Sequence, residues 1–193
     1  MRFLTDVMMK KAGRWLRMLG HDVEPAESED DDALLGQARR GGLILLTKDV
    51  ELHERAQKAG IQSFLPTKKG NAKEVAEILA HFGLNADNFP SRTRCPECNG
   101  PLKEVEKKEV EGRIPQKSFE SHERFWVCGK GGHIFWEGAH WKNIGEEVGK
   151  IREELAAIRG KIAAEKNLAA TRGELSAGNE MSAGKEPAAG TEG

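Results

Sequence analysis

The segment 43–49 constrains the fold of this chain more than any other. Its four consecutive apolar residues, at positions 43–46, follow two glycines and precede Thr47, Lys48 and Asp49. An unbroken apolar run of this length is typical of a strand that is buried on both faces of a parallel sheet. We therefore expect Asp49 to emerge at the carboxyl end of a central strand, the edge at which ligands bind in open α/β sheets.

Strand and helix patterns alternate on both sides of this segment. Strands are predicted at residues 2–5, 21–25, 43–46 and 61–65, and amphipathic helices at 8–20, from 33 onward, at 50–59 and at 71–82. Such alternation predicts a three-layer α/β domain with a parallel sheet, here spanning residues 1–85. Right-handed crossovers then bring the carboxyl ends of all its strands to one edge.

Carboxylates from three separate segments are predicted to meet at that edge. Asp6 follows the first strand, Asp49 follows the third, and the acidic run 29–32 precedes the second helix. Acids in a first helical turn are ordinary caps, but adjacent carboxylates raise each other's pKa unless a cation offsets their charge. Mg²⁺ and Mn²⁺ prefer such oxygen ligands, and these ions activate water for phosphodiester hydrolysis.

Basic residues recur close to the same edge. Lys10, Arg14 and Arg17 are spaced at helical intervals in the first predicted helix, and Lys48 directly precedes Asp49. We expect these cations to hold a phosphate backbone across the site. The competing interpretation is a solvated helix face, which is what a basic stripe usually is.

Four segments together resemble a known nuclease domain. They are Asp6, residues 11–22 (KAGRWLRMLGHD), the helix start at 31–35 (DDALL) and residues 44–49 (ILLTKD). The combination is similar to the PIN-like RNase domain of the Mut-seven C-terminal family, over about residues 1–143. The resemblance implies a PIN-like fold and a metal-dependent ribonuclease, which we expect to be an endoribonuclease.

The resemblance also implies which acids hold the metal. Asp6, Asp31 and Asp49 correspond to the catalytic residues and to the ligands of Mg²⁺ or Mn²⁺. Asp31 is chosen because two leucines follow it at the spacing of the family's helix, while Asp30 and Asp32 remain alternatives. A further acid found in many PIN domains is replaced here by Thr-Lys-Lys, which leaves the number of catalytic metals open.

A second module is predicted at residues 92–143, after a linker at 86–91. Cys95 and Cys98 form a CxxC knuckle, which presents two thiolates to one metal, and Cys128 ends a predicted strand. The chain has three cysteines, and this odd number favours metal ligation over disulfides.

The resembled family carries a zinc ribbon in this place, with its fourth cysteine where this chain has Gly131. We expect His133 to replace that cysteine and to complete a Cys₃His zinc site with Cys95, Cys98 and Cys128. The alternative is a degenerate ribbon that folds without metal and is held by its aromatic residues.

The C-terminal part is predicted to contain one amphipathic helix at residues 145–166, whose apolar residues within 148–162 recur every three or four positions. Such a helix could pack on the ribbon or mediate a weak homodimer. Residues 167–193 lack this periodicity and are predicted to be disordered.

Overall charge and targeting signals limit the cellular context. The 30 basic and 31 acidic residues nearly cancel, so net charge says nothing about a nucleic-acid partner. No apolar run is long enough to span a membrane, and the N-terminus does not resemble a secretory signal. We expect a cytoplasmic protein with an RNA substrate and no membrane partner.

A function of another class fits the same residues. A non-catalytic RNA-binding or ribosome-associated adaptor would use the basic surface and the zinc ribbon, where Trp136 and Trp141 offer rings on which bases can stack. It would bind RNA and cleave none.

Overall fold

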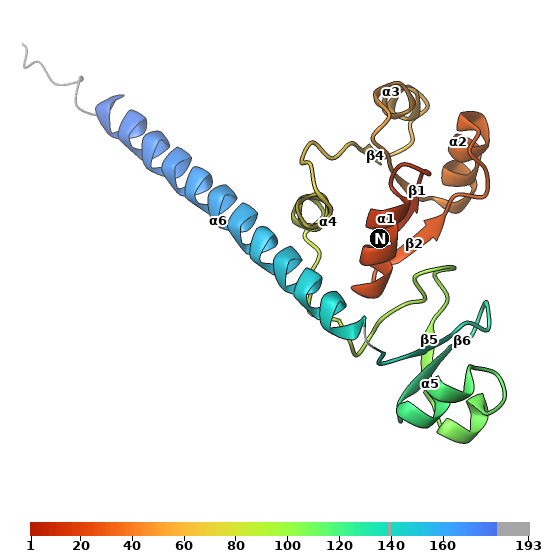
Figure 1. Cartoon of the computed structure of the whole chain (residues 1–193). Helices are drawn as coiled ribbons and strands as arrows, with labels where there is room; N and C mark the ends of the chain where they lie inside the picture. Colours follow the sequence, from red (N-terminus) through yellow and green to blue (C-terminus); the bar gives the residue numbers. More distant parts are fainter. Residues whose placement is uncertain (139, 181–193) are drawn as a thin grey trace, which may run out of the picture. The chain divides into compact units, whose positions relative to one another are not determined.

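The structure is a computed structural model that describes residues 1–138 and 140–180. The chain divides into two compact units, Met1–Leu155 and Ala156–Gly193. The first unit contains a parallel sheet with its helices, a smaller antiparallel sheet, and the beginning of a long C-terminal helix (Figure 1).

The parallel sheet has four strands. They are β1 (Arg2–Thr5), β2 (Asp22–Pro25), β3 (Ile44–Leu46) and β4 (Ser63–Phe64), in the spatial order β2-β1-β3-β4. All three pairings are parallel, with Leu4 of β1 opposite Leu45 of β3. The predicted mixed α/β fold with a parallel sheet is confirmed. Because β1 has β2 on one side and β3 on the other, the chain reverses direction across the sheet between β1 and β3, and this topological switch point is where ligands bind in open sheets.

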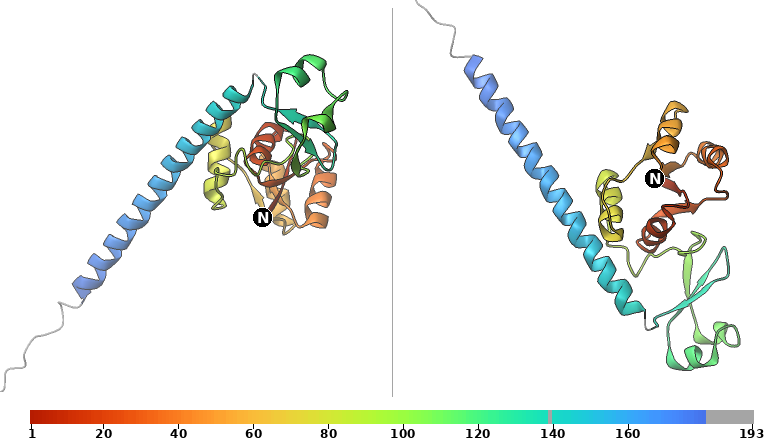
Figure 2. Two further views of the ribbon diagram at one scale, coloured as in Figure 1. Left: turned by 90° about the horizontal axis from the view of Figure 1, so that it is seen from below. Right: turned by 45° about the horizontal axis from the view of Figure 1, so that its top comes forward.

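Four helices connect and cover these strands. They are α1 (Lys10–Met18), α2 (Asp31–Gly41), α3 (Val50–Lys58) and α4 (Asn71–His81), and Figure 2 shows them around the strands from two further directions. The helix α2 is capped by the next residue, Gly42, which adopts a left-handed conformation with φ of 58°, as glycine does readily.

The two faces of the sheet carry separate parts of the core. Leu4 and Leu45 pack in a cluster with residues of α2 and α3, among them Leu34 and Leu52. The neighbouring residue Phe3 points to the opposite face, where its ring meets Phe82 at 5.0 Å. Successive residues of β1 thus pack against helices on opposite faces of the sheet. Packing on both faces holds the ends of the strands in place.

The second module is a three-stranded antiparallel sheet. Its strands are β5 (Leu102–Val105), β6 (Phe125–Cys128) and β7 (Ile134–Trp136), in the order β5-β6-β7. Two short helices that the sequence analysis did not predict, η1 (Lys107–Val110) and α5 (Gln116–Ser121), lie between β5 and β6 in the chain. A capping box between Glu106 and Glu109 stabilises the start of η1.

The C-terminal helix α6 (Trp141–Glu180) is longer than the predicted helix at 145–166. Residues 167–180, part of the segment predicted to be disordered, belong to this helix in the structure. The segment 167–180 contains the helix-favouring residues alanine, leucine, glutamate and arginine. The rest of the predicted tail, 181–193, lies outside the described residues.

The beginning of α6 belongs to the first unit. Val148, Ile151 and Leu155 are buried there, and Arg152 donates hydrogen bonds to the carbonyl oxygen of Ala86. Part of the apolar stripe predicted for a homodimer is thus covered within the chain, while the dimer itself stays a prediction. Among the described residues, no helix combines the length and the apolar character needed to cross a membrane.

Candidate active site and metal centre

Asp6 lies at the switch point, directly after β1. Its side chain is only 4% exposed, and both carboxylate oxygens accept hydrogen bonds. Oδ1 accepts from the backbone N–H of Met9 at 2.8 Å, and Oδ2 accepts from the hydroxyl of Thr47. These bonds fix the orientation of a buried carboxylate at the carboxyl edge of the sheet.

Thr47 connects Asp6 to Asp49. The same hydroxyl oxygen that donates to Asp6 accepts a hydrogen bond from the backbone N–H of Asp49 at 2.9 Å. Asp49 in turn caps α3, because its Oδ1 accepts from the N–H of Leu52 at 3.0 Å. The sequence Thr-Lys-Asp therefore ends a buried strand, begins a helix and positions two acids from neighbouring strands.

Burial raises the pKa of the Asp6 carboxyl above its ordinary value of 3.8, and the negative charge of Asp49 acts in the same direction. Hydrogen bonds from Thr47, Met9 and Met8 oppose this by stabilising the carboxylate. A carboxylate whose ionisation is disfavoured by burial and by a second acid is stabilised when a cation binds beside it.

The acidic run before α2 has other partners. Asp30 caps α2 by accepting from the N–H of Ala33 at 2.8 Å. Arg55 of α3 binds the two aspartates that follow, with Nη1 at 2.8 Å from Asp31 and Nη2 at 2.5 Å from Asp32. Arg55 is thus the cation that offsets the charge of the run, a role that the sequence analysis gave to a metal.

A cleft of about 400 Å³ opens beside Asp6. Six of its charged lining residues come from α1, the end of β1, the loop after β2 and the CxxC knuckle: Asp6, Lys10, Arg14, Glu27, Glu29 and Glu97. Lys10 and Arg14, the residues predicted to meet a phosphate backbone, are exposed. Arg14 pairs with Glu97 at 2.5 Å, and the two side chains are 45% and 43% exposed.

Arg17 and Lys48 have partners within the protein. Arg17 is 2% exposed, and its guanidinium donates to the carbonyl oxygen of Pro96 through Nε at 3.0 Å and to that of Val23 through Nη1 at 3.1 Å. Lys48 forms an ion pair with the buried Glu74. The geometry therefore gives Arg17 a structural role, joining α1 to the knuckle, in place of the predicted RNA contact.

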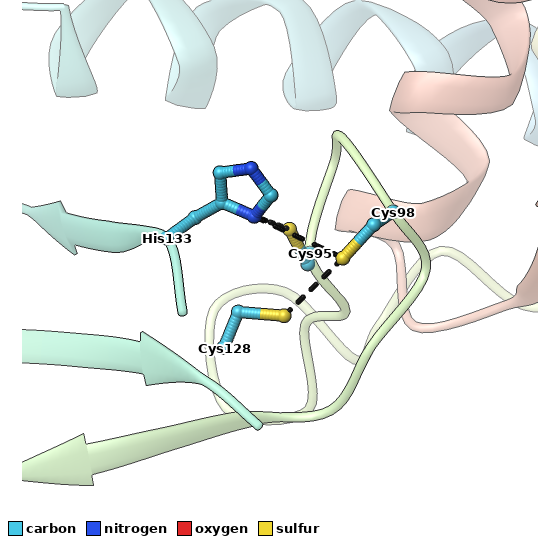
Figure 3. Close-up of side chains that lie close together, drawn as sticks. All are labelled: Cys95, Cys98, Cys128 and His133. Carbon is cyan, nitrogen blue, oxygen red and sulfur yellow. Dashed lines mark hydrogen bonds between the residues drawn. The ribbon is translucent and has the colours of Figure 1, made fainter. Parts of the chain in front are cut away.

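Cys95, Cys98, Cys128 and His133 form the second candidate site (Figure 3). Their ligand atoms all lie within 4.8 Å of one another, and theirs is the one group of this kind among the described residues. The distances are 3.4 Å between the sulfurs of Cys98 and Cys128, and 3.6 and 3.8 Å from Nδ1 of His133 to the sulfurs of Cys95 and Cys98. Tetrahedral zinc with its usual bond lengths requires edges of about 3.5–3.8 Å. These three distances lie near that range, so the group is compatible with zinc.

Asp6, Asp31 and Asp49 do not form such a group in the part of the chain that the structure describes. Asp6 and Asp49 are brought close together, whereas Asp31 is held by Arg55. The three-aspartate metal site therefore stays a prediction, and the four-ligand site is the one whose residues the structure assembles.

Two glycines make room for the four ligands. A Cβ atom added at Gly100 would lie 2.6 Å from the sulfur of Cys128. A Cβ atom added at Gly131 would lie 2.5 and 2.6 Å from Cε1 and Nδ1 of His133. The position at which the resembled ribbon has a cysteine must therefore be glycine here for His133 to reach the site.

Comparison with known proteins adds one finding. The sequence profile of the Mut7-C RNAse domain matches residues 1–148. The chain belongs to the Mut7-C RNase domain family. No curated protein and no solved structure matches the chain. The Mut7-C match covers both the parallel sheet with its acidic edge and the antiparallel module with its Cys₃His group, so the family resemblance seen in the sequence is confirmed for both modules.

The thiols of this Mut7-C chain differ in acidity. Burial raises the pKa of Cys95 to about 11. Burial also acts to raise the pKa of Cys128, but hydrogen bonds from the backbone of Gly131 and Lys130 and from Cys98 and His133 outweigh it, so that this pKa is lowered to about 6. Cys128 is thus mainly a thiolate at neutral pH, the form that binds metal.

Three charged residues around the Mut7-C acidic edge were missed by the sequence analysis: Arg55, Glu74 and Glu97. Arg55 and Glu74 lie on predicted helices, but their partners are set by how those helices pack on the sheet. Glu97 lies between the two cysteines of the CxxC knuckle, so the sequence pattern there indicates metal binding and gives no sign of a role at the cleft. Only the docking of the knuckle on α1 brings it to the cleft.

Proposed function

We propose that this chain is a divalent-metal-dependent endoribonuclease that hydrolyses RNA in the cleft beside Asp6. The observation that carries the proposal is the link from Asp6 through Thr47 to Asp49 at the switch point of a parallel sheet. Membership of the Mut7-C RNase domain family supports a ribonuclease rather than another use of this edge.

Asp6 and Asp49 would hold Mg²⁺ or Mn²⁺. Their oxygens are the hard ligands that these ions prefer, and Mg²⁺ is commonly bound by one or two carboxylates with water in its remaining positions. When bound, such an ion lowers the pKa of a coordinated water and offsets charge on the reacting phosphate. Thr47 keeps the Asp6 carboxylate oriented, and the cap on α3 does the same for Asp49.

Asp31 is the proposed third carboxylate. Its Oδ2 accepts a hydrogen bond from Arg55 at 2.8 Å, so joining the site requires that this ion pair exchange for the metal. The pair is partly exposed, with side-chain exposures of 35% and 38%, and ion pairs of this kind contribute about 0.2–1 kcal/mol. The exchange therefore costs little.

Lys10 and Arg14 are the proposed phosphate contacts. Both lie on α1 and line the cleft beside Asp6. Arg14 is paired with Glu97, but the pair is exposed and correspondingly weak, so a phosphate can take the place of Glu97. Cations that meet phosphate oxygens fix the position of the strand without reading its sequence.

We further propose that the Cys₃His group binds one structural Zn²⁺. All four positions of a tetrahedral ion would be filled by protein atoms, which is typical of structural rather than catalytic zinc. The ion would fix the conformation of the knuckle, in which the carbonyl oxygen of Pro96 accepts a hydrogen bond from Arg17 and Glu97 pairs with Arg14 at the cleft.

A direct assay tests the function. Purified full-length protein is incubated with end-labelled single-stranded and structured RNAs, with Mn²⁺, with Mg²⁺ or with neither, and its zinc content is measured. We expect internal fragments only with added Mn²⁺ or Mg²⁺, and one zinc per chain. Omission of the ion, rather than a chelator, leaves the zinc in place. Equal RNA binding in all three conditions without any fragment would instead establish the non-catalytic adaptor.

A further inference from the structure

A second cavity lies on the other side of the knuckle from the cleft. Its volume is about 230 Å³, and five aromatic rings line it: Phe89, Trp126, Phe135, Trp136 and Trp141. We call it the aromatic pocket. The rings come from the linker, from β6 and β7, and from the start of α6.

The aromatic pocket concentrates ring surface unusually. Three of the four tryptophans of the chain line it, and all three are half-buried. The rings of Trp126 and Trp141 are stacked, with centroids 5.8 Å apart and an interplanar angle of 9°, and Phe89 lies 5.3 Å from Trp141. Half-buried, mutually supported rings form a rigid platform on which a further flat ring can stack.

The charge of the aromatic pocket differs from that of the cleft. Among its described lining residues, Arg94 is the one charged side chain, whereas glutamates line the cleft. Arg94 is held in place by Asn99, whose Oδ1 accepts from Nε at 2.9 Å. A second cation, Arg124, lies 5.0 Å from the ring of Trp126. Arg94 also pairs with Asp22 at 3.4 Å, and Arg124 pairs with Glu104 and Glu137. The apolar walls of the pocket therefore suit a neutral flat ring, and the anionic backbone to which it is attached would have to replace these acids at the two arginines.

The aromatic pocket and the cleft share their dividing wall. On α1, Arg17 lines the cleft and the next residue, Met18, lines the aromatic pocket. Pro96 of the knuckle lines the aromatic pocket, and the next residue, Glu97, lines the cleft. A strand whose phosphates lie along Lys10 and Arg14 therefore has to cross only this wall to place a base among the rings.

We propose that the aromatic pocket binds one unpaired nucleobase of the RNA strand whose backbone occupies the cleft. The inference rests on the proposed function for the identity of the strand. Stacking of an unpaired base on aromatic side chains is the usual way in which proteins recognise single-stranded RNA, and it tolerates every base. A base within a duplex cannot enter, so the pocket makes the site selective for single strands, bulges and ends.

The test measures stacking separately from cleavage. Short single-stranded RNAs carry the fluorescent base 2-aminopurine at successive positions, and full-length protein is added without Mg²⁺ or Mn²⁺, so that the strand stays intact. We expect the emission to be quenched at one position only, near the point at which the same RNA is later cut. A fully paired RNA of the same sequence should show no such position.

Variants of one residue connect the signal to the aromatic pocket. Trp136→Leu keeps an apolar but smaller side chain and removes the ring, and we expect it to abolish the quenching and to weaken binding of single-stranded RNA by about 5- to 150-fold. Trp136→Phe retains a ring and should restore most of both. Trp15→Phe removes a tryptophan outside the pocket and serves as the control, with binding like that of wild type.

Three results would overturn the inference. The first is RNA binding without quenching at any position, and the second is a Trp136→Leu variant that binds RNA as tightly as wild type. The third is a Trp136→Leu variant in which only the oligomeric state changes, which would mean that a second copy of the chain covers the pocket. A failure of the proposed function is distinguishable, because it would leave quenching and its loss in Trp136→Leu intact while no fragment forms with Mn²⁺.

Discussion

The hydroxyl of Thr47 donates a hydrogen bond to Oδ2 of Asp6, although the two residues are 41 positions apart in the chain. The same oxygen accepts from the N–H of Asp49, so one side chain sets the relation between the acids that end β1 and follow β3. The proposed catalytic edge depends on this hydroxyl as much as on the carboxylates.

Replacing Thr47 with valine should therefore impair both folding and activity. Valine has a similar shape but lacks the hydroxyl, which leaves Oδ2 of the buried Asp6 without its donor and the N–H of Asp49 without an acceptor. Unpaired buried groups cost about 1–3 kcal/mol each, so we expect a loss in this range in the free energy of unfolding, measured in urea, together with a marked loss of RNA cleavage. Thr47→Ser keeps the hydroxyl and should retain both properties; equal behaviour of the two variants would refute the bridging role.

Replacing Asp6 with asparagine should stabilise the protein while removing activity. Between pH 3.8, the ordinary pKa, and the raised pKa in the folded protein, the folded state holds more protons than the unfolded state, so wild-type stability falls as pH rises through this interval. The side chain of asparagine does not ionise, so the variant escapes this loss. Without Mg²⁺ or Mn²⁺, we expect a higher Tm for the variant at pH 7 and a smaller difference near pH 4. A variant that melts below wild type at pH 7 would contradict this account of Asp6.

Arg14 and Arg17, one turn apart on α1, should give opposite phenotypes. Arg17→Met leaves the carbonyl oxygens of Pro96 and Val23 without their donor, and we expect a loss of about 2–5 kcal/mol in the free energy of unfolding. Arg14→Gln removes an exposed ion pair and should cost less than about 1 kcal/mol while weakening RNA binding. Urea unfolding and RNA titration of both variants check the division, which fails if Arg14→Gln is the less stable of the two.

Gly131→Ala should weaken zinc binding without changing the ligands. The added Cβ atom would lie 2.5 Å from Cε1 of His133 and 3.0 Å from the sulfur of Cys98, so the ligands must shift. We expect zinc affinity to fall about 10- to 100-fold, measured by competition with a chromophoric chelator. Gly129→Ala is the matched control, because the nearest atom to its added Cβ would be Cγ of Pro101 at an ordinary 3.7 Å. Similar zinc release from the two variants would argue against His133 as the fourth ligand.

The sheet was predictable because its signals are local. The four apolar residues of the run that contains β3 all avoid water only when the strand is buried on both faces. Gly42 before the run ends α2, and Asp49 after it caps α3. The CxxC spacing, together with the resemblance to a family that carries a zinc ribbon, likewise sufficed to group the four ligands that the structure assembles.

The partners of the charged residues were not predictable, because they depend on packing between segments. Arg14 and Arg17 look alike in the sequence, yet docking of the knuckle buries one and leaves the other exposed. The acidic run before α2 suggested a metal, but Arg55 of another helix forms ion pairs with two of its acids, Asp31 and Asp32. The length of α6 was missed because its C-terminal part lacks the apolar stripe on which the prediction relied.

The most direct measurement is RNA cleavage with Mn²⁺ by Asp49→Asn beside Glu51→Gln. Asparagine is as good a helix cap as aspartate, so Asp49→Asn keeps α3 while removing the charge that would bind the ion. Glu51 is an exposed acid in the same first turn, and Glu51→Gln removes an equal charge outside the proposed site. We predict that Asp49→Asn loses at least about 100-fold in cleavage rate, as expected when metal-assisted activation of water is lost, while Glu51→Gln cleaves like wild type. Undiminished cleavage by a folded Asp49→Asn variant would contradict the account.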